Sequence, residues 1–483
     1  MARVLALVIV LVLGCSSKRP NLAAWTNTGV PAGTGGATAA IQRAVVPRRR
    51  PVYPLGVSEN KRYLVGRDGM PFLLAGDSPQ CLTARLSVSE MQTYFATRAQ
   101  QGFNAAWVNA LCTKYTGGNE DATTLDGIAP FLAKLGDGHY DLTRPNPAFF
   151  ARVDAAVAAA AQHGIVLFLD PIETGGFLDT LRANGLPNVR SYGRFVGQRY
   201  VASDNIVWLS GNDFRAWLSG TDDALVREVA LGIKDSDARH LQTVELDYPK
   251  YMSALDDPTW EPLIDINTTY TYHPTYAQLY VDYNRSNHLP NVMIEGNYEG
   301  ENASSAPHVT NAHDCRTQYY WSNLSGATGS FYGNKHIWPI LPAWKDHLAD
   351  PGAVQIGYGQ ALFQSRAWHR LVPDQTNSVV FSGLGDRTAD GNAQDNTYAT
   401  AARTDDGTLV MVYLPTARAV AVDMTKLAGP VTARWFDPTT GTYSPAAGGT
   451  LRNTGMSMFT PLAPAHDDGF TDWVLVLETN PVD

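Results

Sequence analysis

The sequence predicts a (β/α)8 TIM barrel followed by a small antiparallel β-sandwich, and three observations carry this prediction. Between residues 72 and 333, eight short apolar runs alternate with segments of helical periodicity. Several of these runs are apolar throughout, as strands buried on both faces require. After residue 374, short β-branched and aromatic runs are broken at turn residues, which is typical of antiparallel strands. An open doubly wound sheet is the alternative, but the sequence lacks its glycine-rich phosphate-binding motif.

A hairpin opens the folded region, because two apolar runs in "KRYLVGRDGMPFLLAGDS" flank a Gly-Arg-Asp-Gly turn. The first barrel helix, in "LSVSEMQTYFATRAQQG", begins at a capping box of Ser87 and Glu90 and ends at Gly102. The next helix, in "NPAFFARVDAAVAAAAQHG", opens with Asn146 before a proline and closes at Gly164. Both helices therefore carry a start and a stop signal.

The remaining elements follow from the same alternation of periodicity. Further helices are expected in "VRSYGRFVGQRYV", "TDDALVREVALGIK", "TYAQLYVDYNR" and "HDCRTQYYWSNLSG". The eight expected barrel strands are "FLLAG", "NAAWVN", "IVLFLD", "NIVWLS", "LQTVEL", "IDINTTY", "NVMIE" and "GSFYG". In the sandwich, strands are expected in "LVMVYLP", "ARWFDPTTGTY" and "DWVLVLE".

The N-terminus predicts export. "MARVLALVIVLVLGC" has one Arg, an apolar run too short to cross a bilayer, and a small residue before Cys15. "VLGC" is similar to a bacterial lipobox, which predicts lipidation of Cys15 and a periplasmic or outer-membrane-anchored lipoprotein. The predicted organisation is a signal peptide with lipobox over 1–15, a flexible linker over 16–54, the barrel over 55–374 and the sandwich over 375–483.

The composition limits which partners and cofactors are expected. A net charge of -9 and no basic helix exclude a nucleic-acid partner, since the basic patch "VPRRRP" lies in the linker. The sequence has no HExxH motif, no clustered Cys and His and no Ca²⁺-loop spacing, so we expect neither a metal nor an organic cofactor. Export makes a disulfide between Cys81 and Cys112 feasible at neighbouring strand ends, while two buried free thiols are the alternative.

Two carboxylates stand out at the ends of predicted strands, where barrel enzymes place their catalytic groups. Asp213 follows the fourth strand and Glu295 ends the seventh, and these strands lie across the barrel mouth from each other. Glycosidic bond hydrolysis needs one carboxylic acid to protonate the leaving oxygen and one carboxylate across the sugar. The sequence therefore predicts a retaining glycoside hydrolase with Asp213 as acid/base and Glu295 as nucleophile. Helix capping or an ion pair with Arg215 is the alternative for Asp213.

Other polar and aromatic side chains at strand ends are candidates for sugar binding. Asp77 binds substrate hydroxyls or caps a helix, and His273 binds substrate or orders its loop. Glu299 lies further along its loop and is expected to be structural, and Arg316 either orients Glu295 or pairs with an aspartate of its own helix. Aromatic candidates are sugar platforms or core residues. The candidate substrate-binding residues are Asp77, Asn109, Asn212, Tyr272, His273, Tyr298 and Trp338.

Several motifs in this order resemble the apiosidase-like family of TIM-barrel glycoside hydrolases: "RYLVGRDGMPFLLAGDS", "GFNAAWVN", "NIVWLSGND", "MIEGNYEG" and "RTQYYWSNLSGATGSFYGNKHIW". The tail, with "ARWFDPTTGTY" and "FTPLAPAHDDGFTDWVLVLE", resembles the collagen-binding-type β-sandwich that commonly follows this barrel. The resemblance implies that Asp213 and Glu295 are the catalytic pair, acting on a polysaccharide or oligosaccharide side chain. Asn212 stands where the family usually has Gly, and Gly296 where it often has Pro. The wider clan's Asn at this point holds the sugar 2-hydroxyl.

A non-catalytic cell-surface protein that binds glycan or matrix, built on a degenerate glycosidase barrel, is the opposing prediction. The enzyme requires the two carboxyl groups to face an open cleft at the barrel mouth. A filled or flat mouth would favour the binding protein, with the sandwich as its working part.

Overall fold

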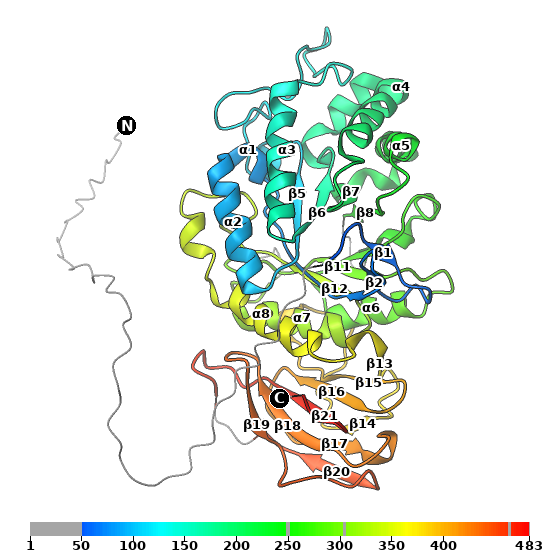
Figure 1. Ribbon diagram of the computed structural model, residues 1–483, viewed down its shortest axis with the longest axis vertical. Coiled ribbons are helices and arrows are strands. Elements are labelled where there is room, and N and C mark those ends of the chain that lie inside the picture. Colours follow the sequence, from blue (N-terminus) through cyan, green and yellow to red (C-terminus); the bar gives the residue numbers. More distant parts are fainter. Residues whose placement is uncertain (1–50, 248–251, 303–305, 462–464, 483) are drawn as a thin grey trace, which may run out of the picture. The chain divides into compact units, whose positions relative to one another are not determined.

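A computed structural model describes residues 51–247, 252–302, 306–461 and 465–482 of the chain. The expected signal peptide, the lipobox and most of the expected linker lie outside these residues. No helix within the described ranges is long and apolar enough to span a bilayer. Figure 1 shows the barrel elements in blue to yellow and the C-terminal strands in orange to red.

All eight predicted barrel strands are present, and they lie in one sheet in the order expected of a barrel. β12 pairs in parallel with β4, so the last barrel strand returns to the first. A short antiparallel strand, β9 (Met252–Ser253), joins β10 as the ninth strand of this sheet. β8 and β10 lie at the remaining seam, where the backbone N–H of Asp265 donates to the carbonyl of Gln242. The barrel strands are β4 (Leu74–Asp77), β5 (Ala105–Asn109), β6 (Val166–Asp170), β7 (Ile206–Phe214), β8 (Gln242–Leu246), β10 (Asn267–Tyr270), β11 (Asn291–Glu295) and β12 (Gly329–Tyr332).

The N-terminal hairpin and the helix caps also match the predictions. β2 (Leu64–Val65) pairs antiparallel with β3 (Pro71–Phe72), and β1 (Gly56–Val57) extends this small sheet. The capping box of Ser87 and Glu90 is formed at the start of its helix. The other predicted helices form near their expected positions. The helices are α2 (Val88–Gln101), α3 (Pro147–Gln162), α5 (Gly220–Ser236), α6 (Thr275–Tyr283) and α7 (Ala312–Leu324).

Three helical segments differ from the prediction. α4 runs over Thr174–Tyr200, well before its expected start, because two helices meet at a kink where Gly185 has φ 68°. α8 (Pro351–Gln364) was not predicted, since "PGAVQIGYGQALFQ" is buried over most of its length and shows no polar face. A short helix, α1 (Leu82–Arg85), follows β4.

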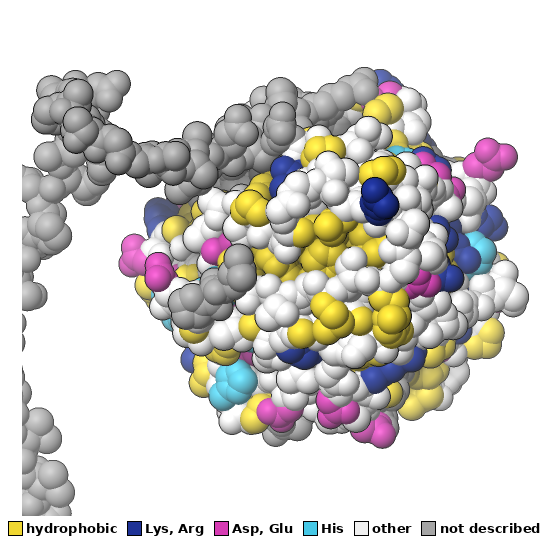
Figure 2. All heavy atoms as spheres, turned by 90° about the horizontal axis from the view of Figure 1, so that it is seen from below, with side chains coloured by type: hydrophobic (Ala, Val, Ile, Leu, Met, Phe, Trp, Pro, Cys, Tyr) yellow, Lys and Arg dark blue, Asp and Glu magenta, His cyan; other side chains and the backbone are white. Residues whose placement is uncertain are grey.

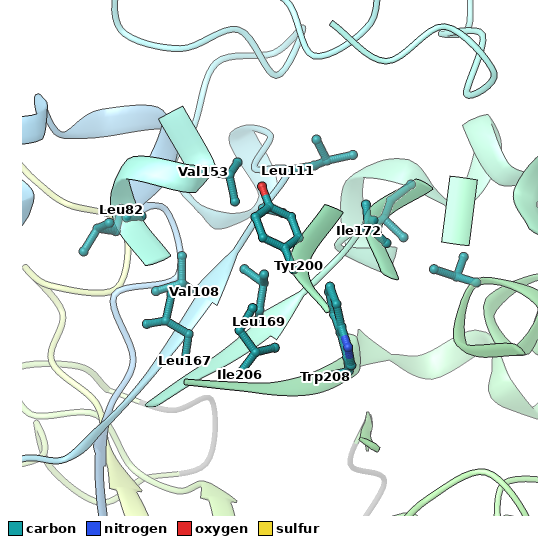
Figure 3. Close-up of a cluster of buried hydrophobic side chains, with 14 of the residues drawn as sticks. Leu82, Val108, Leu111, Val153, Leu167, Leu169, Ile172, Tyr200, Ile206 and Trp208 are labelled. Atoms are coloured by element: carbon teal, nitrogen blue, oxygen red, sulfur yellow. The ribbon is translucent and has the colours of Figure 1, made fainter. Parts of the chain in front are cut away.

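Side chains alternate along the barrel strands between two cores. Trp107, Phe168 and Phe331 belong to the cluster inside the barrel, and all three are buried. Their strand neighbours, such as Val108 and Leu167, pack against the surrounding helices, as Figure 3 shows. Because side chains fill the barrel interior, a substrate can reach only the groups at the strand ends.

The C-terminal strands form two antiparallel sheets with a core between them, as predicted. The six-stranded sheet has the order β13-β15-β16-β21-β18-β19, and the three-stranded sheet has the order β14-β17-β20. The first strand of this domain, β13, begins slightly before the expected boundary at residue 375. The strands are β13 (Leu371–Pro373), β14 (Val380–Ser382), β15 (Thr400–Thr404), β16 (Leu409–Leu414), β17 (Val420–Asp423), β18 (Thr432–Asp437), β19 (Thr442–Pro445), β20 (Met456–Phe459) and β21 (Trp473–Glu478).

Some hydrophobic side chains of the sandwich lie outside its core. Figure 2 shows hydrophobic side chains gathered on one face of the molecule. Phe381 on β14 and both Met456 and Met458 on β20 are among the exposed large hydrophobic residues. They contribute to the surface of the three-stranded sheet rather than to the core between the sheets.

Both expectations for Arg316 on α7, that it orients Glu295 or pairs with an aspartate of its own helix, are wrong. Its guanidinium is fully buried and pairs with Asp472, with Nη2–Oδ1 at 2.6 Å and Nε–Oδ2 at 2.8 Å. A further bond, from Nη1, reaches Asp468 at 2.7 Å. Arg316 therefore neither orients Glu295 nor pairs with Asp314; it ties a barrel helix to the C-terminal domain.

We expect Arg316→Met to lower the melting temperature by several degrees, because removing one partner of a buried ion pair leaves an uncompensated charge and costs about 3–5 kcal/mol. Differential scanning calorimetry measures the change. Arg370→Met is the matched control, since Arg370 pairs with aspartates on the surface and such pairs contribute about 0–1 kcal/mol. Equal melting temperatures for both variants would contradict this prediction.

Candidate active site

A backbone bulge at the end of β7 presents Asp213. Three consecutive residues have positive φ, Gly211 at 116°, Asn212 at 70° and Asp213 at 51°. The pairing of β7 with β8 shifts register across this bulge. Glycine is required at 211, because a Cβ there would lie 2.1 Å from the carbonyl oxygen of Glu245. Left-handed backbone at non-glycine residues is typical of functional sites, and here it accompanies the predicted acid.

Asp213 makes hydrogen bonds through both its carboxyl group and its backbone. The Tyr115 hydroxyl donates to its Oδ2 at 2.7 Å, and the Asp213 backbone N–H donates to Glu245 Oε2 at 2.7 Å. Burial raises the pKa of Asp213, the hydrogen bond from Tyr115 lowers it, and the negative charge of Asp247 raises it further. The net upward shift favours a protonated Asp213, which is the form that a general acid needs.

Glu295, the last residue of β11, is held by two tyrosines. Tyr272 donates to Oε1 at 2.9 Å and Tyr298 donates to Oε2 at 2.9 Å. Burial, followed by the negative charge of Asp213, raises the pKa of Glu295 to about 8, and the tyrosine hydrogen bonds oppose this rise. The two carboxyl groups therefore interact, and each donor fixes one oxygen of Glu295.

A third carboxyl group, that of Glu245 on β8, was not predicted. It is fully buried beneath the bulge. Burial, then the charges of Asp213 and Glu295, raise its pKa well above the ordinary value, which favours a neutral Glu245. Its sequence signal was a single acidic residue inside the strand "LQTVEL". A neutral group here supports the bulge without adding a third negative charge.

An open cavity of about 790 Å³ lies at this end of the barrel. Asp213 and Tyr272 line it, whereas Glu295 lies behind Tyr272 and is not part of the wall. Arg215 is also on the wall, but its guanidinium pairs with Asp247, not with Asp213 as the alternative interpretation required. The barrel mouth is therefore neither filled nor flat, but of the two predicted catalytic carboxyl groups only that of Asp213 lies on the cavity wall.

The two amide candidates are bonded to each other at the bulge, which contains Asn212. Asn109 Nδ2 donates to Asn212 Oδ1 at 3.2 Å, and Trp107 donates to Asn109 Oδ1 at 3.0 Å. Both asparagine side chains are buried. The structure thus brings Asn109, Asn212, Tyr272 and Tyr298 together with Asp213 and Glu295.

Three candidates contact groups elsewhere in the fold. Asp77 is fully buried, and its carboxylate accepts from Arg98 at 2.5 Å and from a tyrosine, so it is engaged in an internal ion pair. His273 Nδ1 lies 2.5 Å from the carbonyl of Gly391. Trp338 donates to Glu301 at 2.5 Å. We leave these three residues out of the site.

Glu299 lies four residues beyond Glu295 but in a different environment. Its Oε2 accepts from Tyr332 at 2.5 Å and from the backbone N–H of Gly352 at 3.1 Å. These internal partners agree with the expected structural role. Among the residues that the structure describes, no group of three or more His, Cys, Asp or Glu side chains is placed to hold a metal ion.

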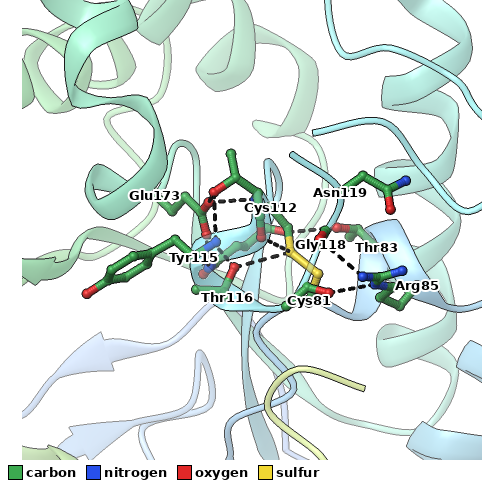
Figure 4. The surroundings of a disulfide bond; sticks show 12 residues. Cys81, Thr83, Arg85, Cys112, Tyr115, Thr116, Gly118, Asn119 and Glu173 are labelled. Atoms are coloured by element: carbon green, nitrogen blue, oxygen red, sulfur yellow. Dashed lines mark hydrogen bonds between the residues drawn. A yellow bond between two sulfur atoms is a disulfide. The ribbon is translucent and has the colours of Figure 1, made fainter. Parts of the chain in front are cut away.

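The sequence allowed either a disulfide or two buried free thiols at Cys81 and Cys112, and the structure has the disulfide. Cys81 and Cys112 are bonded, with 5.6 Å between their Cα atoms (Figure 4).

Tyr115, which the sequence did not single out, lies three residues after Cys112. Its only sequence signals were this cysteine and the pair Gly175–Gly176, whose small size lets the Tyr115 loop approach.

The fold and the site define a glycosidase-type barrel. Two family models match the chain, "Apiosidase-like, catalytic domain" over residues 58–370 and "Putative collagen-binding domain of a collagenase" over residues 386–478. The first match covers more than half of the sequence, so the chain belongs to the apiosidase-like family, as the resemblance predicted. No curated protein matches the sequence.

Solved structures agree with the fold. A protein described as a glycoside hydrolase is 23% identical with a TM-score of 0.74, and the match covers 89% of this chain and 97% of that one. A family 5 glycoside hydrolase from Bacteroides vulgatus is 23% identical with a TM-score of 0.72, covering 88% of this chain and 93% of that one. At this level of identity the likeness shows the shared fold.

Proposed function

We propose that the protein is a retaining glycoside hydrolase that acts on a side chain of a polysaccharide or oligosaccharide. The observation that carries the proposal is a pair of buried, interacting carboxyl groups at the ends of the fourth and seventh barrel strands, beside an open cavity. In the mechanism that uses such a pair, the groups act on opposite sides of one glycosidic bond.

In the first step Asp213 is protonated and Glu295 is ionised, a state that the raised pKa of Glu295 makes less populated below about pH 8. Asp213 gives its proton to the glycosidic oxygen while the Glu295 carboxylate attacks the anomeric carbon. The bond to the leaving group breaks, and a covalent glycosyl-enzyme forms. In the second step, Asp213 takes a proton from water, whose oxygen attacks the same carbon and releases Glu295. Hydrogen bonds from Tyr272 and Tyr298 hold Glu295 in one orientation and stabilise its ionised form.

The compartment forms part of the proposal. We propose that the chain is exported and held at a membrane by a lipid on Cys15. The disulfide between Cys81 and Cys112 supports this, because disulfides persist in oxidising compartments.

The test is a screen of the purified protein against aryl glycosides and pectic oligosaccharides, followed by ¹H NMR of the first sugar released from a cleaved substrate. We expect cleavage with the anomeric configuration of the substrate retained. An inverted first product would contradict the nucleophile role of Glu295. Binding without cleavage across the panel would favour the non-catalytic glycan-binding protein.

A further inference from the structure

The loop that follows β5 places a tyrosine on the proposed acid/base. We propose that Tyr115 is a positioning residue for Asp213, and that the loop carrying it is held in place by the Cys81–Cys112 disulfide and Glu173. This inference rests on the proposed function and adds to it a residue that controls the same site.

Tyr115 contacts both Asp213 and the cavity. Its hydroxyl donates to Asp213 Oδ2 at 2.7 Å, and its partly exposed side chain forms part of the cavity wall. Burial and the charge of Asp213 raise the pKa of Tyr115, so the hydroxyl stays protonated and remains a donor. The contact joins two loops of the barrel mouth that are far apart in the sequence.

Glu173 anchors the turn that carries Tyr115. This turn is a short 3-10 helix, η1 (Lys114–Thr116), capped by Thr113. The fully buried Glu173 carboxyl accepts from the Thr113 backbone N–H at 2.6 Å, and from the hydroxyls of Thr113 and Thr116. Figure 4 shows these bonds between Glu173 and the turn. One carboxyl group thus holds the turn on both sides of Tyr115.

The disulfide holds the start of the same turn. Cys112 directly precedes Thr113 and is bonded to Cys81, the residue before α1. At the far end of the turn, Arg85 of α1 donates to the carbonyl of Gly117 at 2.7 Å. The two ends of the turn are therefore attached to the two ends of α1, through Cys81 and Arg85.

Two glycines in α4 leave room for this arrangement. A Cβ on Gly175 would lie 2.3 Å from the Tyr115 ring, and one on Gly176 would lie 2.1 Å from the Thr113 hydroxyl. Glycine within a helix costs about 1 kcal/mol relative to alanine, so adjacent glycines are unfavourable for the helix alone. Close approach of the Tyr115 turn explains both of them.

The hydrogen bond has a predictable effect on acid catalysis. A donor stabilises the ionised carboxylate and lowers its pKa. Losing the Tyr115 hydroxyl should raise the pKa of Asp213 and leave its carboxyl free to adopt other rotamers. The acid would then stay protonated to higher pH, which moves the basic limb of the kcat/KM profile in the alkaline direction.

Tyr115→Phe is the decisive variant, because it keeps the ring and removes only the hydroxyl. We expect kcat/KM to fall about tenfold, the effect of one hydrogen bond to a charged group, and the basic limb to move to higher pH. Tyr140→Phe is the matched control, since the Tyr140 hydroxyl donates to the Asp121 carbonyl outside the site. It should leave the pH profile unchanged.

A double-mutant cycle tests the role of the disulfide. We expect Cys81→Ser/Cys112→Ser to lower kcat/KM and to move the basic limb in the same direction, with circular dichroism confirming that the variant is folded. Adding Tyr115→Phe to this variant should then produce a smaller additional loss than it does in the wild type, because both changes break the same contact. Full additivity would separate the disulfide from Tyr115 and overturn that half of the inference.

Failure of the role inferred for Tyr115 can be distinguished from failure of the proposed function. Wild-type kcat/KM and an unchanged pH profile for Tyr115→Phe, beside an inactive Glu295→Gln, would overturn the positioning role and leave the proposed function intact. A wild-type protein that cleaves nothing, or a fully active Glu295→Gln, would overturn the proposed function and this inference with it.

Discussion

Glu295→Gln is expected to lower kcat by a factor on the order of 10⁴ to 10⁶, as removal of the nucleophile does in other covalent mechanisms. The amide keeps the shape of the side chain and can still accept from Tyr272 or Tyr298, but it cannot form the glycosyl-enzyme. The loss is measured as turnover of an aryl glycoside that the wild type cleaves.

Glu299→Gln is the matched control for this variant. Glu299 is also buried and also accepts from a tyrosine, Tyr332, but its charged neighbours are Asp350 and Arg98, whereas that of Glu295 is Asp213. It should retain turnover within a few-fold of the wild type. Near wild-type activity of Glu295→Gln, or equal losses in the two variants, would remove Glu295 from the nucleophile role.

Glu295→Gln should also change how stability depends on pH. Burial and the charge of Asp213 raise the pKa of Glu295 from 4.5 to about 8 in the folded chain. Between these values the folded state holds a proton that the unfolded state releases, so this group makes the protein less stable as pH rises. The variant lacks this cost, and its Tm should exceed that of the wild type by more at pH 8 than at pH 5. A gap that is equal at both values in calorimetry would contradict the raised pKa.

Asp213→Ala is expected to lower kcat about 10² to 10⁴-fold on substrates with poor leaving groups, because general acid catalysis contributes this much. Activated aryl leaving groups need little protonation, so their first step should be nearly unaffected. Hydrolysis of the glycosyl-enzyme then becomes slow, because no base remains to activate water.

Azide makes this prediction specific. The small anion occupies the space of the missing carboxyl and attacks the glycosyl-enzyme without a base, so turnover of the variant should rise and a glycosyl azide of retained configuration should form. Asp235→Ala is the control, since Asp235 pairs with Arg190 on a helix surface, and azide should not affect it. An azide product of inverted configuration, or no rescue, would contradict the roles given to the two carboxyl groups.

Predictability from sequence varied with the kind of feature. The Ser87 and Glu90 capping box and the barrel strands were predicted correctly, because both depend on neighbouring residues and on a period of apolar side chains. α8 was missed because a helix buried over most of its length shows no polar face. Arg316 was placed wrongly because its partners, Asp472 and Asp468, come from the other domain.

Within the candidate site, the sequence by itself determined that Asp213 and Glu295 stand at strand ends, since an apolar run followed by an acidic residue is a local pattern. Only the tertiary structure decided that Glu245 lies beneath the bulge, that Cys81 bonds to Cys112, and that Tyr115 reaches Asp213. Closing the barrel brings together loops that are separated by many residues along the chain. Contacts of this kind depend on the register of the barrel strands and on the space left by small residues such as glycine. Neither the register nor this space can be predicted from a short stretch of sequence.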